Sequence, residues 1–135
     1  MLIIHFTEPA ADPLDAFGAT RARYLPLVEG QGNSHVSCLH LDSNAGIVSP
    51  SLTHAAALLV VHGGITVTTQ LPTIRVDIHA GMGCVFEAGE RYSIDSVFGA
   101  ILLIVEAESL SAHEHGISTP ARITGATWPG DNLAV

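Results

Sequence analysis

Eight histidines are the side chains of this sequence best suited to acid–base or ligand chemistry. Histidine changes charge near neutral pH and its ring nitrogens bind metals, so it can serve in either role. The other basic residues are five arginines, because the sequence contains no lysine. Schiff-base formation and the lysine of a phosphate-binding loop are therefore excluded. The sequence also lacks a nucleophile elbow and a serine–histidine–aspartate order.

Strand parity limits which histidines can point into a core. His54 and His62 have the same parity and would line one face of a regular strand. His35 and His40 lie on opposite faces of another predicted strand, so only one of them can be internal. His40 shares its face with Cys38 and is the better candidate for the interior.

Cysteine spacing does not support a metal knuckle or a disulfide framework. Cys38 and Cys84 are too few and too far apart for either, and both lie in apolar runs. We therefore expect two buried free thiols. His113 and His115 form an i, i+2 pair that could chelate on an extended segment, but no third ligand lies near them in the sequence.

The elements that must position these residues are short apolar runs separated by turns, a pattern typical of an all-β sandwich or barrel. Gly63-Gly64 and Leu71-Pro72 predict hairpin turns. Segment 12–18 begins with Asp-Pro and ends in glycine, which predicts one helical turn. The predicted strands are 21–28, 35–42, 54–62, 65–70, 73–79, 84–87, 92–96 and 98–106.

Two of the predicted strands, over 55–61 and 100–105, are apolar on both faces. A strand with one solvated face would alternate, so both must be covered on two sides. One cover would be the interior of a small barrel. The other would be the N-terminal segment or a partner subunit, and we favour a homodimer.

Length and composition indicate one globular domain, with 135 residues, 47% hydrophobic and 13% charged. Within it we expect an N-terminal strand or arm over 1–33, a barrel over 34–108 and a C-terminal arm over 109–135. The net charge of −8 disfavours nucleic acid as a partner. No apolar run approaches the ~20 residues of a membrane helix, and no signal-type start is visible. We therefore expect no membrane partner and a cytoplasmic location.

The most specific pattern covers residues 81–96. Gly81 is followed after five residues by Glu87-Ala88-Gly89, then after two by Tyr92 and after three by Ser96. This spacing resembles the second cupin motif, and the apolar strand that ends at Gly63-Gly64 resembles the first. The acidic-alanine-glycine-acidic run 87–90 is similar to that of small single-domain bacterial cupins of uncharacterised function. The resemblance implies a double-stranded β-helix, or jelly-roll barrel, whose lumen holds a metal or a small ligand.

The metal site that this resemblance implies is degenerate here. Counting back from Gly63, the first-motif ligand positions fall on Pro50, Leu52 and Ala56, which cannot bind a metal. Tyr92 replaces the histidine of the second motif. A tight site needs at least three converging donors, so we expect no metal and no other cofactor.

The sequence therefore predicts a cupin-like barrel that binds a small molecule in its lumen without the standard metal. The candidate ligand-binding residues in the lumen are His54, Tyr92, His40 and Glu87. One alternative is a metal-dependent enzyme of the dioxygenase or isomerase type, with ligands drawn from these same residues. A second alternative is a ligand-sensing module that acts through a protein partner.

Overall fold

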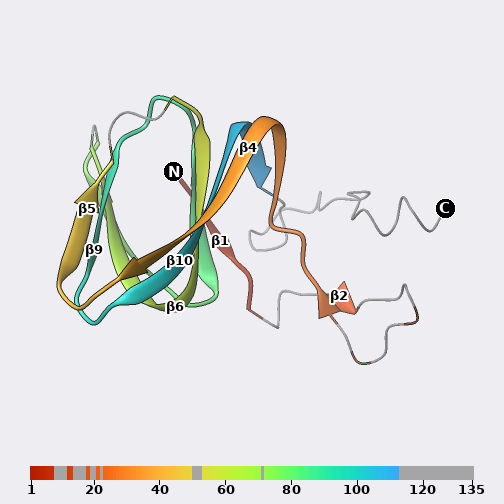
Figure 1. The fold of residues 1–135 in the computed structure, drawn as a ribbon, viewed down its shortest axis with the longest axis horizontal. Helices are drawn as coiled ribbons and strands as arrows, with labels where there is room; N and C mark the ends of the chain where they lie inside the picture. Colours follow the sequence, from red (N-terminus) through yellow and green to blue (C-terminus); the bar gives the residue numbers. More distant parts are fainter. Residues whose placement is uncertain are drawn as a thin grey trace.

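A computed structural model describes residues 1–7, 12–13, 18, 21, 23–49, 53–70 and 72–112, and all the regular structure in these ranges is β (Figure 1). None of these residues belongs to a helix that is long and apolar enough to cross a membrane. The strands are β1 (Leu2–His5), β2 (Asp12–Pro13), β3 (Arg23–Tyr24), β4 (Val28–Leu41), β5 (Ala45–Val48), β6 (Ala55–Thr69), β7 (Ile74–His79), β8 (Met82–Phe86), β9 (Tyr92–Ser96) and β10 (Ala100–Ala112).

Eight of these strands form one antiparallel sheet that folds back on itself along β6. The first half of β6 pairs with β8 and β10, and the order on this side is β1-β8-β6-β10-β4. Its second half pairs with β7 and β9, and β9 pairs with β5. The two sides face each other across an interior, with β5 and β9 opposite β4 and β10 (Figure 1).

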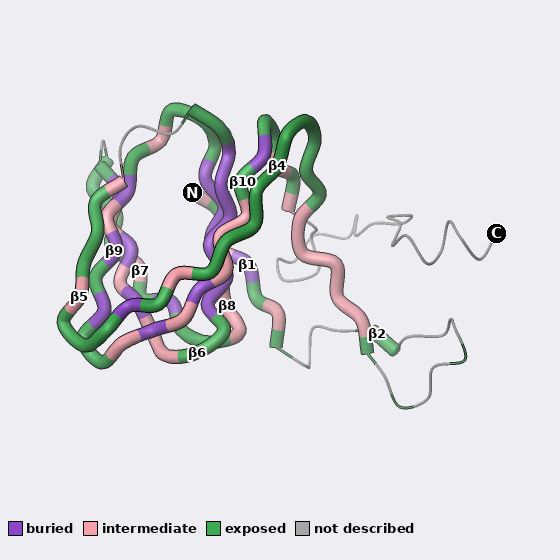
Figure 2. The backbone as a smooth tube through the Cα atoms, viewed as in Figure 1, coloured by how far each residue is buried: buried purple, intermediate pink, exposed green. Residues whose placement is uncertain are grey.

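The interior contains the main hydrophobic cluster, drawn from both sides of the fold. Leu58 and Val60 of β6, Phe86 of β8, Ile94 of β9 and Leu102 of β10 are all completely or almost completely buried in it. Residues of the opposite parity form a second cluster on the outer face of the first side, around Ile4, Ala57, Leu59 and Val85. The first half of β6 is therefore buried on both faces, as its sequence predicted (Figure 2).

A β-bulge interrupts the alternation of β6. Leu102 of β10 pairs with Val60, whereas the preceding Ile101 pairs with His62, so Val61 is the extra residue. Because a bulge changes the parity of all following residues, His62 lies on the outer face and Ile65 again points inward. The prediction that His54 and His62 line one face of a regular strand is therefore wrong.

The structure also corrects the prediction of a hairpin at Gly63-Gly64, because β6 runs through both residues and bends there. Of the described residues in the predicted strand 21–28, only Arg23–Tyr24 (β3) and Val28 lie in strands. The predicted strand 35–42 is part of the longer β4, which begins at Val28 and pairs along its length with β10. Asp12 and Pro13 form β2 against β3, so they do not begin a helical turn. The described residues Gln70, Pro72 and Thr73 are turn residues between β6 and β7, on either side of Leu71, which lies outside the described residues.

The N-terminal residues, for which a strand or arm was expected without bounds, supply β1. It pairs with β8 at the edge of the first side. Toward the other end of the chain, β10 continues to Ala112, beyond its predicted end and into the predicted arm 109–135. The rest of that arm, from 113 onward, lies outside the described residues with its His113–His115 pair.

The glycines of segment 81–96 have the conformations that the motif requires. Gly81 lies between β7 and β8 with φ +90°, and Gly89 lies between β8 and β9 with φ +93°. In the second of these turns the amide of Glu90 donates to the carbonyl of Glu87 at 3.2 Å. A positive φ at the third position of such a turn favours glycine.

Candidate functional site

Tyr92 lies in the interior cluster, as the sequence predicted. It is buried, and its ring stacks on that of Phe86, with centroids 4.5 Å apart and an angle of 14° between the planes. Burial raises the pKa of its hydroxyl, because the charged form loses water, and the nearby Cys84 and Glu106 raise it further. The phenol therefore remains protonated at neutral pH and can donate a hydrogen bond.

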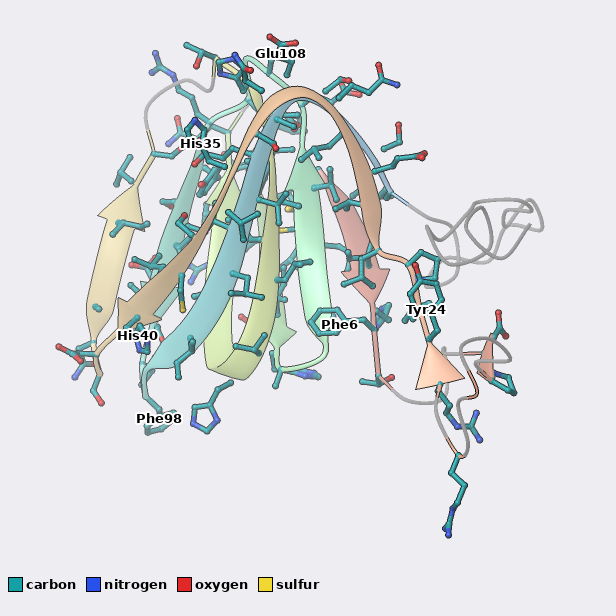
Figure 3. All side chains as sticks on the ribbon, turned by 45° about the vertical axis from the view of Figure 1, so that its right-hand side comes forward. Phe6, Tyr24, His35, His40, Phe98 and Glu108 are labelled. Carbon is teal, nitrogen blue, oxygen red and sulfur yellow. The ribbon has the colours of Figure 1, made fainter. Side chains whose placement is uncertain are left out.

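Glu106 and His35 are further polar residues at this end of the interior. Glu106 pairs with His35 on one side and with Ala56 on the other. Paired residues point to the same face, and Glu106 follows the inward-pointing Leu102 and Ile104 at intervals of two. Both residues are exposed, and we call the end of the interior with Tyr92, Glu106 and His35 its mouth; Figure 3 labels His35, which lies midway along β4.

Glu106 was not predicted from the sequence, and His40 was preferred to His35 as the one internal histidine of their strand. A signal for Glu106 was present, because it follows the apolar Leu102 and Ile104 at intervals of two. Strand parity placed His35 and His40 on opposite faces, and the pairing with Glu106 shows that His35 is on the inner one.

His40 does not point into the interior. Its neighbours Leu39 and Leu41 do, so His40 is on the outer face of β4, where it is exposed. The expectation of a lumen position for His40 is therefore wrong. Cys38 has the same orientation and is exposed too, with its Sγ atom 3.6 Å from Nε2 of His40. Of the two thiols expected to be buried, only Cys84 is.

His54 and Glu87 are exposed as well. His54 immediately precedes β6, and its Nδ1 atom lies 3.1 Å from the hydroxyl of Thr53. Glu87 begins the turn after β8, where its backbone amide donates to Oε2 of Glu90 at 2.7 Å. It lines a surface depression with Val85 and Leu110 of the outer face, so its side chain does not line the lumen. Tyr92 is the only one of the four candidates that lies in the core.

The residues at the metal positions of the cupin motifs do not fit a metal. Ala56 faces the interior with only a methyl group, and Tyr92 offers a phenol that burial keeps protonated. Pro50 and Leu52 lie outside the described residues and have no donor side chain. Within the part of the chain that the structure describes, no group of three or more His, Cys, Asp or Glu side chains could hold a metal ion.

Comparisons with known proteins identify the fold. No family model matches the sequence, and no curated protein does. The structure is similar to the CENP-C cupin domain of Drosophila melanogaster, with a TM-score of 0.50, 18% identity, and coverage of 53% of this chain and 59% of that one. It is also similar to the Cnp3 cupin domain of Schizosaccharomyces pombe, with a TM-score of 0.50, 19% identity, and coverage of 63% and 59%.

A third similar structure is an RmlC-like cupin from Shewanella frigidimarina, with a TM-score of 0.50, 18% identity, and coverage of 56% and 66%. In all three comparisons the match spans less than two thirds of the solved chain. At these identities the likeness concerns the fold alone. The chain has the cupin fold, an all-β jelly roll, as its motifs predicted.

Proposed function

We propose that the protein binds a small organic molecule at the mouth of its interior, without a metal. The observation that supports this most is the position of Tyr92, a desolvated phenol at the border between an apolar cluster and the polar pair of Glu106 and His35. Ligand pockets combine a mainly apolar lining with a few polar groups that orient the ligand.

The polar groups indicate the kind of ligand. Tyr92 can donate a hydrogen bond, whereas the carboxylate of Glu106 can only accept one. Ile104 and Leu39 supply partly buried apolar surface on the same face. A molecule with an apolar body and a hydroxyl head, which both donates and accepts, matches this arrangement.

Thermal-shift screening of organic acids, alcohols and sugars against metal-free protein tests the proposal, with calorimetry to measure the affinity of each hit. We expect Tyr92→Phe and Glu106→Gln to weaken binding about tenfold each, since each removes one charge-assisted or buried hydrogen bond. Glu108→Gln is the matched control, because Glu108 is on the same strand but is not among the groups that act on Tyr92. Hits that bind all variants equally would contradict the proposed site.

A metal measurement separates this proposal from the alternative of an enzyme with rearranged ligands. Purified protein would be incubated with iron, manganese, nickel and zinc, desalted, and analysed for metal per chain. We expect much less than one equivalent. A stoichiometric metal that Tyr92→Phe releases would instead support the enzyme.

We further propose a second copy of the chain as partner. Ile101, Leu103 and Val105 on the outer face of β10 are only half-buried, and Val36 beside them on β4 is 68% exposed. The neighbouring outer positions of β4 are Cys38 and His40, so this stripe has no Asp, Glu, Lys or Arg in a chain of net charge −8. Among the described residues, β4 pairs with β10 alone and is the last strand on its side, so its other edge has no strand partner there (Figure 2). Exposed apolar strands at a free edge favour pairing with another copy.

A further inference from the structure

The second half of β6 carries a pocket on its outer face, on the opposite side of the strand from the interior cluster. The pocket has a volume of ≈ 530 Å³, which is in the range of small-molecule sites. Its polar lining comes from His62 and Thr66 of β6, Asp77 and His79 of β7, and Asp95 of β9. None of these residues belongs to the mouth of the interior, so this pocket is independent of the proposed function.

Gly64 creates this pocket. It lies in β6 beside His79, where every other residue type would place a side chain over the outer face. The backbone does not require glycine here, because Gly64 is not among the residues with positive φ. An added Cβ would meet only ordinary contacts, at 3.6 Å from the carbonyl oxygen of Ile78 and 3.8 Å from Cβ of His79. Glycine weakens a strand and often marks the close approach of a ligand.

Two carboxylates flank the pocket. Asp95 and Asp77 are paired with Thr66 from either side, so they lie two strand spacings apart, roughly 10 Å. The hydroxyl of Thr66 donates to Oδ1 of Asp77 at 2.7 Å, which leaves the second oxygen of that carboxylate available. Among the described residues neither aspartate forms an ion pair, so their charges are not neutralised within this part of the fold.

The rim of the pocket is apolar. Ile65 and Ile78 line the pocket through their backbone, and their side chains point away from it into the interior cluster. Phe98, at the turn between β9 and β10, is 92% exposed and lines the rim, and Figure 3 shows it projecting from that end of the molecule. An aromatic face beside uncompensated carboxylates attracts organic cations, through cation–π and charge interactions.

We propose that this pocket binds a small organic cation, an ammonium group on an apolar body. The apolar body would fill the space above Gly64 and contact Phe98, while the ammonium group would lie against Asp95 or Asp77. A bare metal ion does not match, because no three of the described ionisable side chains are close enough to hold one.

Calorimetry with phenethylammonium as the probe, and with 2-phenylethanol as its neutral counterpart, tests the proposal. We expect the ammonium to bind at least tenfold more tightly than the alcohol and to lose affinity at high salt, which screens exposed charges. Gly64→Val fills the pocket and should abolish binding. Asp95→Asn removes one charge and should weaken binding several-fold, which keeps the test valid if Gly64→Val alters the fold.

Thr68→Val is the matched control, since Thr68 is on the outer face of the same strand but does not line the pocket. Tyr92→Phe separates this site from the mouth of the interior and should leave phenethylammonium binding unchanged. No binding of the ammonium at millimolar concentration, equal binding of the alcohol, or equal binding by Gly64→Val and Asp95→Asn would each overturn the proposal.

Discussion

The two halves of β6 belong to one continuous strand but have different surroundings. Residues 55–60 are all buried, because the interior cluster covers one face and the outer cluster around Ile4 and Leu59 covers the other. In the second half Ile65, Val67 and Thr69 are buried, while Thr66 and Thr68 are partly exposed. The half that is covered twice contributes stability. The second half has one solvent-facing side, which can carry a polar pocket. One strand therefore contributes stability through its first half and a candidate binding site through its second.

The two adjacent glycines at the bend give the sharpest test of this division. Gly63 has φ +79°, and a Cβ there would clash with the carbonyl oxygen of Gly99. We expect Gly63→Ala to destabilise the protein by about 2–5 kcal/mol, from backbone strain and overpacking together. Gly64→Ala should change stability by less than about 1 kcal/mol, because its backbone conformation and space accommodate a methyl group.

Urea unfolding followed by circular dichroism measures both effects. Equal destabilisation by the two variants would contradict the assignment of Gly63 to the fold and Gly64 to the pocket.

A buried thiol beside the first half of β6 should also make stability depend on pH. Cys84 pairs with Leu58, and burial raises the pKa of its thiol from 9.0 to about 12. Above pH 9.0 the unfolded chain loses this proton while the folded chain keeps it, so stability falls as pH rises toward 12. The expected slope approaches about 1.4 kcal/mol per pH unit. Tyr92, with its raised pKa, adds to the loss above pH 10.0.

Unfolding free energies measured across the alkaline range provide this slope, and Cys84→Ala removes the thiol's part of it. The comparison uses slopes, because the alanine variant also loses packing. A slope that is the same in both proteins would show that the thiol is solvated in the folded state.

The smallest expected effect concerns the outer face of the first side. A charge at Val36 should weaken a dimer that uses this face by about tenfold, or about 1.4 kcal/mol. Val48→Glu is the matched control, since Val48 is 82% exposed on β5, across the interior from β4. Light scattering over a concentration series measures the association of Val36→Glu, Val48→Glu and the unmodified protein. A monomer at all concentrations, or equal weakening by both variants, would contradict the dimer.

The sequence predicted the fold from local signals. Short apolar runs separated by turns located most strands, and the spacing of Gly81 and Gly89 located two turns whose glycines both have positive φ. The length of β4 was not predictable in this way, because Gly30 and Gly32 interrupt its pattern. Its pairing with β10, which is a tertiary interaction, holds these glycines in the strand.

The candidate site was harder to predict because it depends on which face each side chain occupies. One extra residue at Val61 changes the parity of β6, and no local feature of the sequence indicates it. The assignment of His40 failed for a related reason: both faces of its strand contain apolar residues, so alternation did not distinguish the inner face. Tyr92 was predictable because its place relative to Gly89 in the motif determined it.

The sharing of β6 between both sides of the fold also affects how the molecule opens. An amide in the middle of β6 can exchange with solvent only if its ladder breaks, and β6 has partners on both sides of the bend. Neither side of the sheet can unfold alone, because both sides pair with β6 and the loss of one would leave part of β6 without its partners. We therefore expect the amides of β6 to exchange together, in the slowest group and with the free energy of global unfolding. Among the described strands of the eight-stranded sheet, β1 at the far edge pairs only with β8 and should exchange before β6.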